Sequence, residues 1–209
     1  MTTETKQISI AGMGAIIHEG GVFFRVWAPH AEQVAVVGDF NNWKEGATML
    51  TSEENGHWGG NVENAKAGEE YKFFLKTPAG DLHRNDPYAM QMNHSNGNGI
   101  IYDHAKFDWE GQDEFLTPSW NELVIYEMHI GTFNVKEGEE IGDFYSAIEK
   151  LDFLRDLGIN AIEVMPAAEF PGARSWGYNP SQPFAVETDY GGPDGFKAFI
   201  KAAHEMRIA

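Results

Sequence analysis

The sequence predicts two domains, an antiparallel β-sandwich followed by alternating strands and helices with parallel strands. Two observations indicate this division. Up to about Asp108, short runs of β-branched and aromatic residues end at turn signals, whereas after Pro118 apolar runs of strand length alternate with helical stripes. We therefore expect a sandwich domain over residues 10–108, a linker over 109–120 and an α/β domain over 121–209.

The first domain is expected to be an immunoglobulin-like β-sandwich. Its apolar runs are short, show no helical period and end at glycine or proline. These runs are residues 21–27 (GVFFRVW), 33–37 (QVAVV) and 70–75 (EYKFFL), with further turn signals at Asn55-Gly56 and Asn98-Gly99. Several short strands at this spacing are typical of an antiparallel sandwich.

Two strands are expected in the second domain. Residues 123–126 (LVIY) form a near-continuous apolar run, which is typical of a strand buried on both faces, and residues 161–165 (AIEVM) form the second strand. With helices between and after them, the strands should be parallel. Two such βα units cannot close a barrel or cover both faces of a sheet, so we expect the chain to be the N-terminal fragment of a longer protein.

Two helices are expected between and after these strands. Asp143 is a suitable N-cap and Gly158 a suitable C-terminal stop for the first helix, and Pro193 fits the first turn of the second. The apolar side chains recur at the i, i+3, i+4 spacing of a buried helix face. They are Phe144, Ala147, Ile148, Leu151 and Leu154 in the first helix, and Phe196, Phe199, Ile200 and Ala203 in the second.

Composition disfavours several classes of partner and location. Fifteen Lys and Arg against 32 Asp and Glu give a formal charge of −17, which disfavours nucleic acid and anionic membrane surfaces but not a neutral sugar. No run approaches the roughly 20 apolar residues of a membrane span, and the polar start carries no secretory signal, so we expect a cytoplasmic protein. Without cysteine or an H-E-x-x-H helix, the sequence implies neither a metal nor a cofactor.

Three motifs of the first domain resemble carbohydrate-binding module family 48, whose modules precede the catalytic barrel of enzymes acting on α-glucan. The motifs are residues 24–29 (FRVWAP), 37–43 (VGDFNNW) and 71–74 (YKFF). The resemblance implies that the module binds α-glucan, such as glycogen, amylose or malto-oligosaccharides.

The resemblance also implies the sugar contacts of the module. Trp43 lies in a turn-rich stretch where its ring should be exposed, and the matching tryptophan of glycogen-binding relatives stacks on glucose. Lys72 and Asn98 fall where those relatives place polar contacts. A second binding tryptophan is replaced here by Leu82 or His83. The alternative for Trp43 is packing under the sandwich or against the barrel.

Three motifs of the second domain resemble glycoside hydrolase family 13, the α-amylase family. They are residues 124–133 (VIYEMHIGTF), 161–166 (AIEVMP) and 176–180 (WGYNP), which are similar to the first strand, the second strand and the loop after it. The resemblance implies the first two βα units of a (β/α)8 TIM barrel. It also implies a retaining mechanism with an aspartate nucleophile, a glutamate acid/base and a stabilising aspartate.

We assign no catalytic residue in this chain. In the family the three acids lie at the ends of the fourth, fifth and seventh strands, and the chain ends before the third. The 209-residue chain alone is therefore expected to be inactive. Glu127, His129 and Glu163 could in principle form an acid/base group, but the alternative is a hydrogen-bonded polar layer inside the barrel.

Tyr178 is the main candidate for substrate binding in the second domain. It follows the second strand, on the barrel face where active sites are built from the βα loops. In the family the matching tyrosine lines the subsite that holds the sugar being cleaved, and Trp176 and Asn179 flank it. The alternative is an aromatic side chain that only packs the loop.

The resemblance implies an α-glucan-active parent enzyme, with 1,4-α-glucan branching in glycogen biosynthesis as the first expectation. The segment 175–180 (SWGYNP) favours this reaction. The segment 169–172 (EFPG) also resembles malto-oligosyltrehalose trehalohydrolases, in which water is the acceptor, and α-amylase activity is a further alternative. A second class of hypothesis is a non-catalytic glucan-binding protein with a degenerate barrel.

Overall fold

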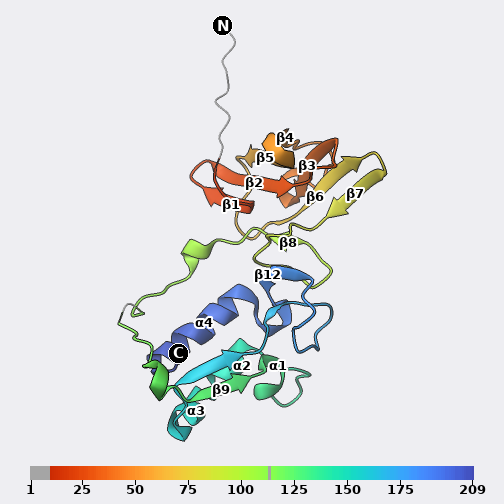
Figure 1. Ribbon diagram of the computed structural model, residues 1–209. Coiled ribbons are helices and arrows are strands. Elements are labelled where there is room, and N and C mark those ends of the chain that lie inside the picture. Colours follow the sequence, from red (N-terminus) through yellow and green to blue (C-terminus); the bar gives the residue numbers. More distant parts are fainter. Residues whose placement is uncertain (1–9, 113) are drawn as a thin grey trace. The chain divides into compact units, whose positions relative to one another are not determined.

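The computed structural model describes residues 10–112 and 114–209. The chain forms two compact units (Figure 1). Unit 1 contains residues 10–93 and 97–103 of the described chain, and unit 2 contains residues 94–96 and 104–209. The predicted linker over residues 109–120 belongs to unit 2, and its limits as a domain boundary stay a prediction.

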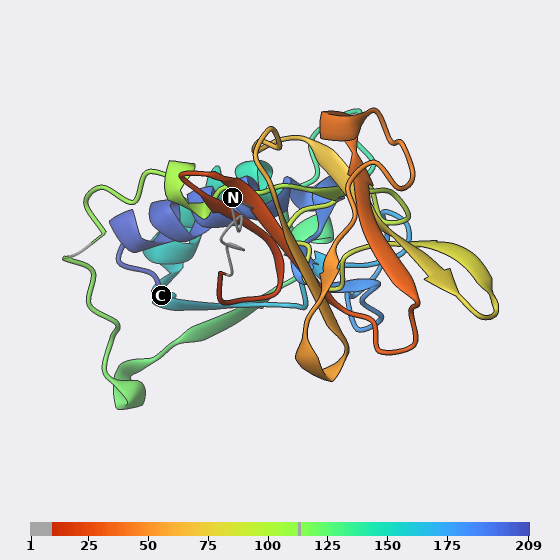
Figure 2. The same cartoon turned by 90° about the horizontal axis from the view of Figure 1, so that it is seen from above.

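Unit 1 is built from two antiparallel sheets. The first sheet has the order β1 (Gly14–His18), β2 (Gly21–Trp27), β5 (His57–Val62) and β4 (Thr51–Ser52). The second has the order β3 (Gln33–Gly38), β6 (Glu70–Thr77) and β7 (Gly80–Arg84), and β8 (Gly99–Ile100) also pairs with β6. The β6–β7 hairpin is yellow in Figures 1 and 2. The predicted antiparallel sandwich is confirmed.

Alternation along the strands separates the core of unit 1 from its outer faces. Phe24 of β2 and Tyr71 of β6 are fully buried, and their ring centroids lie 5.1 Å apart in an edge-on contact. Side chains next to core residues along β3 and β6 point the other way. Ala35, Val37 and Phe74 therefore gather on the opposite side of the second sheet, which we call the outer face.

Unit 2 contains a pair of parallel strands, β9 (Ile125–Met128) and β10 (Ala161–Val164), with Ile125 opposite Ala161. The predicted first strand over 123–126 was placed two residues early, and its expected burial on both faces is wrong. Val124 is 50% and Ile125 54% exposed. In the described chain the helices cover only the face that carries Tyr126, Met128 and Ile162.

The predicted first helix of unit 2 is divided into α2 (Phe144–Ile148) and α3 (Leu151–Leu157). The N–H of Lys150 donates to the Ala147 carbonyl, three residues back, which tightens the end of α2 and breaks the α-helical register. Asp143 caps α2 as predicted, since its carboxylate accepts the Ser146 N–H at 2.6 Å. Gly158 ends α3 at a φ of 92°.

The other elements of unit 2 complete its core. They are α1 (Ile130–Phe133), β11 (Ala168–Glu169), β12 (Gln182–Val186) and α4 (Gly192–Glu205), and Pro193 lies in the first turn of α4 as predicted. Short 3₁₀ turns of both units are η1 (Asp39–Asn41), η2 (Glu54–Gly56), η3 (His104–Lys106), η4 (Trp120–Glu122) and η5 (Thr188–Tyr190). Tyr190 packs edge-on against Phe144 and Phe170, with centroid distances of 6.2 and 5.7 Å.

Within residues 10–112 and 114–209, none of the helices combines the length and the apolar character that crossing a membrane requires.

Candidate functional site

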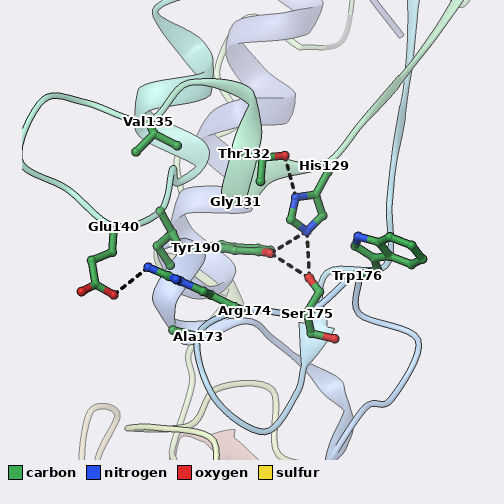
Figure 3. A pocket seen from close by; sticks show the side chains of 11 residues that line it. His129, Gly131, Thr132, Val135, Glu140, Ala173, Arg174, Ser175, Trp176 and Tyr190 are labelled. Atoms are coloured by element: carbon green, nitrogen blue, oxygen red, sulfur yellow. Dashed lines mark hydrogen bonds and ion pairs between the residues drawn. The ribbon is translucent and has the colours of Figure 1, made fainter.

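A cavity of about 590 Å³ lies beside the carboxyl end of β9 in unit 2 (Figure 3). One wall follows β9 directly, and the other comes from the long segment between β11 and β12, which follows β10. The residues lining the cavity are His129, Gly131, Thr132, Val135, Glu140, Ile141, Ala173, Arg174, Ser175, Trp176 and Tyr190. The carboxyl ends of parallel strands are where such folds place their binding groups.

His129 connects the two walls of the cavity. Its Nε2 lies 2.8 Å from the Ser175 carbonyl oxygen and 3.2 Å from the Tyr190 hydroxyl, and its Nδ1 lies 2.9 Å from Thr132 Oγ1 (Figure 3). The expected polar layer of Glu127, Glu163 and His129 is thus assembled only in part. Glu127 and Glu163 are neighbours in register and exposed, whereas the polar partners of the His129 ring are Thr132, Ser175 and Tyr190.

The segment after Ser175 carries the three predicted substrate-binding residues of unit 2. Trp176 is 72% and Tyr178 69% exposed, and of these three residues only Trp176 lines the cavity. Asn179 accepts a hydrogen bond from the Ser175 hydroxyl, whose oxygen accepts the Gly177 N–H at 3.0 Å. Tyr178 and Asn179 lie in the same segment but outside the cavity lining.

Opposite charges lie at the cavity. Arg174 and Glu140 form an ion pair at 3.0 Å, and their side chains are 69% and 85% exposed (Figure 3). An ion pair this exposed contributes little to stability, so both groups remain available to a ligand. Glu140 is the one carboxylate among the lining residues. This set therefore supports binding through an aromatic ring and polar groups, rather than the two-carboxylate chemistry of a glycosidase.

Two buried glutamates lie at the two ends of the region from β11 to β12. Neither was predicted from the sequence as a functional residue. Glu169 accepts the N–H of Thr188 at 2.9 Å and its hydroxyl at 2.7 Å. Glu187 accepts the N–H groups of Phe170 and Asp189 at 3.0 and 3.1 Å. Burial raises the pKa of both carboxyl groups, that of Glu187 to about 7. The available signal was an acidic residue beside an apolar run, at 169–170 and at 184–187.

In unit 1 the structure places Trp43 on the outer face of the second sheet. Its ring is half-buried rather than exposed, because it packs against Ala35, Val37 and Phe74. The indole N–H donates to Asp39 Oδ1 at 2.9 Å, which fixes the direction of the ring. The expectation of an exposed ring is therefore corrected: one side of Trp43 is covered by its own sheet.

Lys72 and Asn98 lie close to Trp43 in the same unit. Lys72 is opposite Val37 in the β3–β6 register and, since it alternates with core residues, belongs to the outer face. The Asn98 amide donates to Glu70 Oε2 at 2.6 Å, and the Glu70 N–H donates to Asp39 Oδ2 at 2.9 Å. Hydrogen bonds through Asp39 and Glu70 thus connect Trp43 to Asn98.

The register of β6 with β7 decides which residue stands in place of a second tryptophan. Leu82 is opposite Leu75, which packs against the core, whereas His83 is opposite Phe74 on the outer face. The rings of His83 and Phe74 lie 5.1 Å apart. His83 is therefore the residue that shares the outer face with Trp43. Across the part of the chain that the structure describes, no three His, Asp or Glu side chains gather in a way that could hold a metal ion.

Comparisons with known families match both units. Residues 12–89 match the model of carbohydrate-binding module 48 (isoamylase N-terminal domain), and residues 125–209 match that of the alpha amylase catalytic domain. The 1,4-alpha-glucan branching enzyme GlgB of Salinibacter ruber is 35% identical over 98% of this chain and 35% of its own length. The malto-oligosyltrehalose trehalohydrolase of Saccharolobus solfataricus is 32% identical over 94% of this chain and 33% of its own length. The chain thus spans about a third of these relatives.

Solved structures show the same architecture. A Salmonella typhimurium protein assigned by name to the alpha amylases is 33% identical with a TM-score of 0.82, over 96% of this chain and 32% of that one. The pullulanase of Bacillus acidopullulyticus has a TM-score of 0.78 at 23% identity, over 98% of this chain and 30% of the pullulanase chain. At this identity the similarity supports the fold alone. The predicted fold class, a sandwich module followed by the start of an α-amylase-type barrel, is confirmed.

Proposed function

Because the chain belongs to the α-amylase family and carries a carbohydrate-binding module 48 ahead of the catalytic part, we propose that the protein acts on α-1,4-glucan and that its reaction is branching. The observation that carries this proposal is the pair of exposed rings, Trp176 and Tyr178, presented beside a cavity next to the carboxyl end of β9. A flat ring matches the apolar face of glucose, and the neighbouring polar groups match its hydroxyls. The similarity to branching enzymes supports the choice of reaction.

The proposed reaction cuts an α-1,4 linkage, holds the chain as a covalent glycosyl intermediate and transfers it to a 6-hydroxyl. In the described part of residues 125–209, β9 and β10 are the parallel strands, and the resemblance to the α-amylase family implies that its three acids lie at later strands. We therefore place the nucleophile, the acid/base and the stabilising aspartate outside this chain and expect the 209-residue chain to be inactive. A cytoplasmic location belongs to the same proposal.

A second candidate is hydrolysis in the manner of the trehalohydrolase relative, which is 32% identical over 94% of the chain. One assay of the complete enzyme separates the candidates. Branching of amylose should lower the iodine colour without new reducing ends, whereas an α-amylase should raise reducing ends, and a trehalohydrolase should release trehalose from trehalose-capped chains. A protein that binds glucan but changes none of these quantities would show the non-catalytic alternative to be right.

Replacing Trp43 with alanine should weaken the binding of the chain to glycogen up to about tenfold, since one stacked ring contributes up to about 1.5 kcal/mol. The measurement is retardation in glycogen-containing native gels. Trp27→Ala is the matched control, because Trp27 is 60% exposed but belongs to β2 in the other sheet. Equal retardation of the natural chain and the Trp43 variant would contradict glucan binding by the outer face.

Replacing Tyr178 with alanine should lower kcat of the complete enzyme by about tenfold to a hundredfold and change KM much less. The reason is that the wall of a reacting subsite acts mainly on the transition state. Tyr178→Phe keeps the ring and should retain most activity. Phe153→Ala on α3, where the ring is 62% exposed, is the control for loss of a surface aromatic. Normal kcat in Tyr178→Ala would assign the ring to loop packing.

A further inference from the structure

His129 holds together parts of unit 2 that lie far apart in the sequence. Its ring contacts Thr132 in α1, Ser175 in the segment between β11 and β12, and Tyr190 in η5 (Figure 3). Ser175 is 46 residues away from His129. We infer that His129 is a positioning residue: it fixes the Ser175 carbonyl and thereby the conformation that presents Trp176 and Tyr178.

The geometry assigns the proton on the His129 ring. The Ser175 carbonyl oxygen can only accept, so Nε2, at 2.8 Å, carries the hydrogen and donates it. In the neutral ring Nδ1 is then the acceptor, and the Thr132 hydroxyl donates to it at 2.9 Å. The Tyr190 hydroxyl also donates to the Ser175 carbonyl, at 3.5 Å. The short His129 bond is the stronger of the two contacts to this carbonyl.

The supports of the His129 ring are themselves fixed. Its backbone carbonyl accepts the N–H groups of Thr132 and Phe133 at 3.1 and 3.0 Å, so the residue is the N-cap of α1. Tyr190 is 2% exposed within the aromatic core. A Cβ at Gly131 would lie 2.9 Å from the Tyr190 hydroxyl oxygen, so only glycine lets that hydroxyl come so close to the backbone.

Ser175 connects His129 to the predicted substrate-binding residues through hydrogen bonds of its own hydroxyl. Its hydroxyl oxygen accepts the Gly177 N–H at 3.0 Å and its hydrogen goes to Asn179. Gly177 takes a left-handed φ of 85°, which turns the chain between Trp176 and Tyr178. Fixing the Ser175 carbonyl therefore fixes the origin of a short hydrogen-bonded turn whose two large rings point to solvent. That this conformation helps substrate binding rests on the proposed function. That His129 fixes the Ser175 carbonyl does not.

Two substitutions of His129, by glutamine and by asparagine, distinguish the role of the Nε2–H hydrogen bond from that of the other ring contacts. Glutamine at position 129 can place an amide N–H near the Nε2 position, whereas asparagine reaches only the Nδ1 position. Trypsin cleavage after Arg174, which is 69% exposed, reports the opening of the segment in the 209-residue chain. His129→Asn should be cleaved there about tenfold faster than the natural chain, and His129→Gln within about twofold of it.

Cleavage after Arg155 in α3 is the internal reference, because this site lies in a different element of unit 2 from the segment that carries Arg174. Equal cleavage after Arg174 in all three proteins, equal acceleration in both variants, or a parallel rise after Arg155 would each overturn the inference. In the complete enzyme, His129→Asn should lower kcat/KM on amylose about tenfold and His129→Gln should restore it. If the natural enzyme does not act on amylose, the proposed function fails, while the proteolysis still decides the role of His129.

Discussion

Gly177→Ala should lower kcat/KM of the complete enzyme by about a hundredfold or more, because a displacement of 1 Å at a binding group costs about that factor. A Cβ at this position would lie 1.8 Å from the carbonyl oxygen of Pro166 and 2.7 Å from its carbonyl carbon. Both are backbone atoms, so no side-chain rotation can relieve the overlap. The φ of 85° adds strain that only glycine avoids. The segment with Trp176 and Tyr178 must therefore move.

Gly172→Ala is the matched control in the same segment. Gly172 has a φ of 80°, but a Cβ there would have no atom within 4 Å. It carries the backbone strain, about 1 kcal/mol, without the overlap. Activity and trypsin cleavage after Arg174 should change strongly in Gly177→Ala and slightly in Gly172→Ala. Equal changes in both variants would mean that backbone strain alone, and not the close approach to Pro166, explains the loss of activity in Gly177→Ala.

Unit 1 should lose stability as the pH rises through the titration of Asp86. This buried carboxyl accepts the Tyr71 hydroxyl at 2.6 Å and the Tyr88 N–H at 2.9 Å, and burial raises its pKa from 3.8 to about 6. Between these values the folded state binds more protons than the unfolded state, so the free energy of unfolding falls with rising pH. The stabilisation is fully present below pH 3.8 and is lost above about pH 6, by about 3 kcal/mol in total.

Asp86→Asn should remove this pH dependence while keeping the contacts. The asparagine amide can donate to the Tyr71 hydroxyl oxygen, and its carbonyl can accept the Tyr88 N–H. The quantity to measure is the difference in unfolding free energy between the natural chain and the variant across the pH range. Such a difference cancels the repulsion among other charges, which is large in a chain of net charge −17. Parallel pH profiles for the two proteins would contradict a buried titrating Asp86.

Local signals in the sequence predicted the parts of the fold that local interactions determine. The short runs of β2, β3 and β6 predicted sandwich strands because their β-branched and aromatic residues, and the turn residues that end each run, are local signals. Asp143 and Pro193 marked the starts of α2 and α4, because capping depends on residues within one turn.

Features that depend on distant partners could not be predicted in this way. The exposure of Val124 and Ile125 depends on which elements cover the sheet, and the half-buried state of Trp43 depends on the packing of Phe74. The contact of His129 with Ser175 spans 46 residues and has no local signature. Trp176 was predicted as a site residue through a family motif, and the structure adds the cavity that it lines.

The apolar side chains that stay exposed in unit 2, including Ile125 of β9, have a thermodynamic consequence. Most of the large apolar side chains that stay exposed belong to unit 2, among them Val124, Ile125 and Phe153. The heat capacity change of unfolding and its denaturant dependence both scale with the surface that unfolding newly exposes. For a similar length, we therefore expect unit 2 to have the flatter stability curve and the shallower response to urea. We therefore expect the unfolding of unit 1 to respond more steeply to both heat and denaturant.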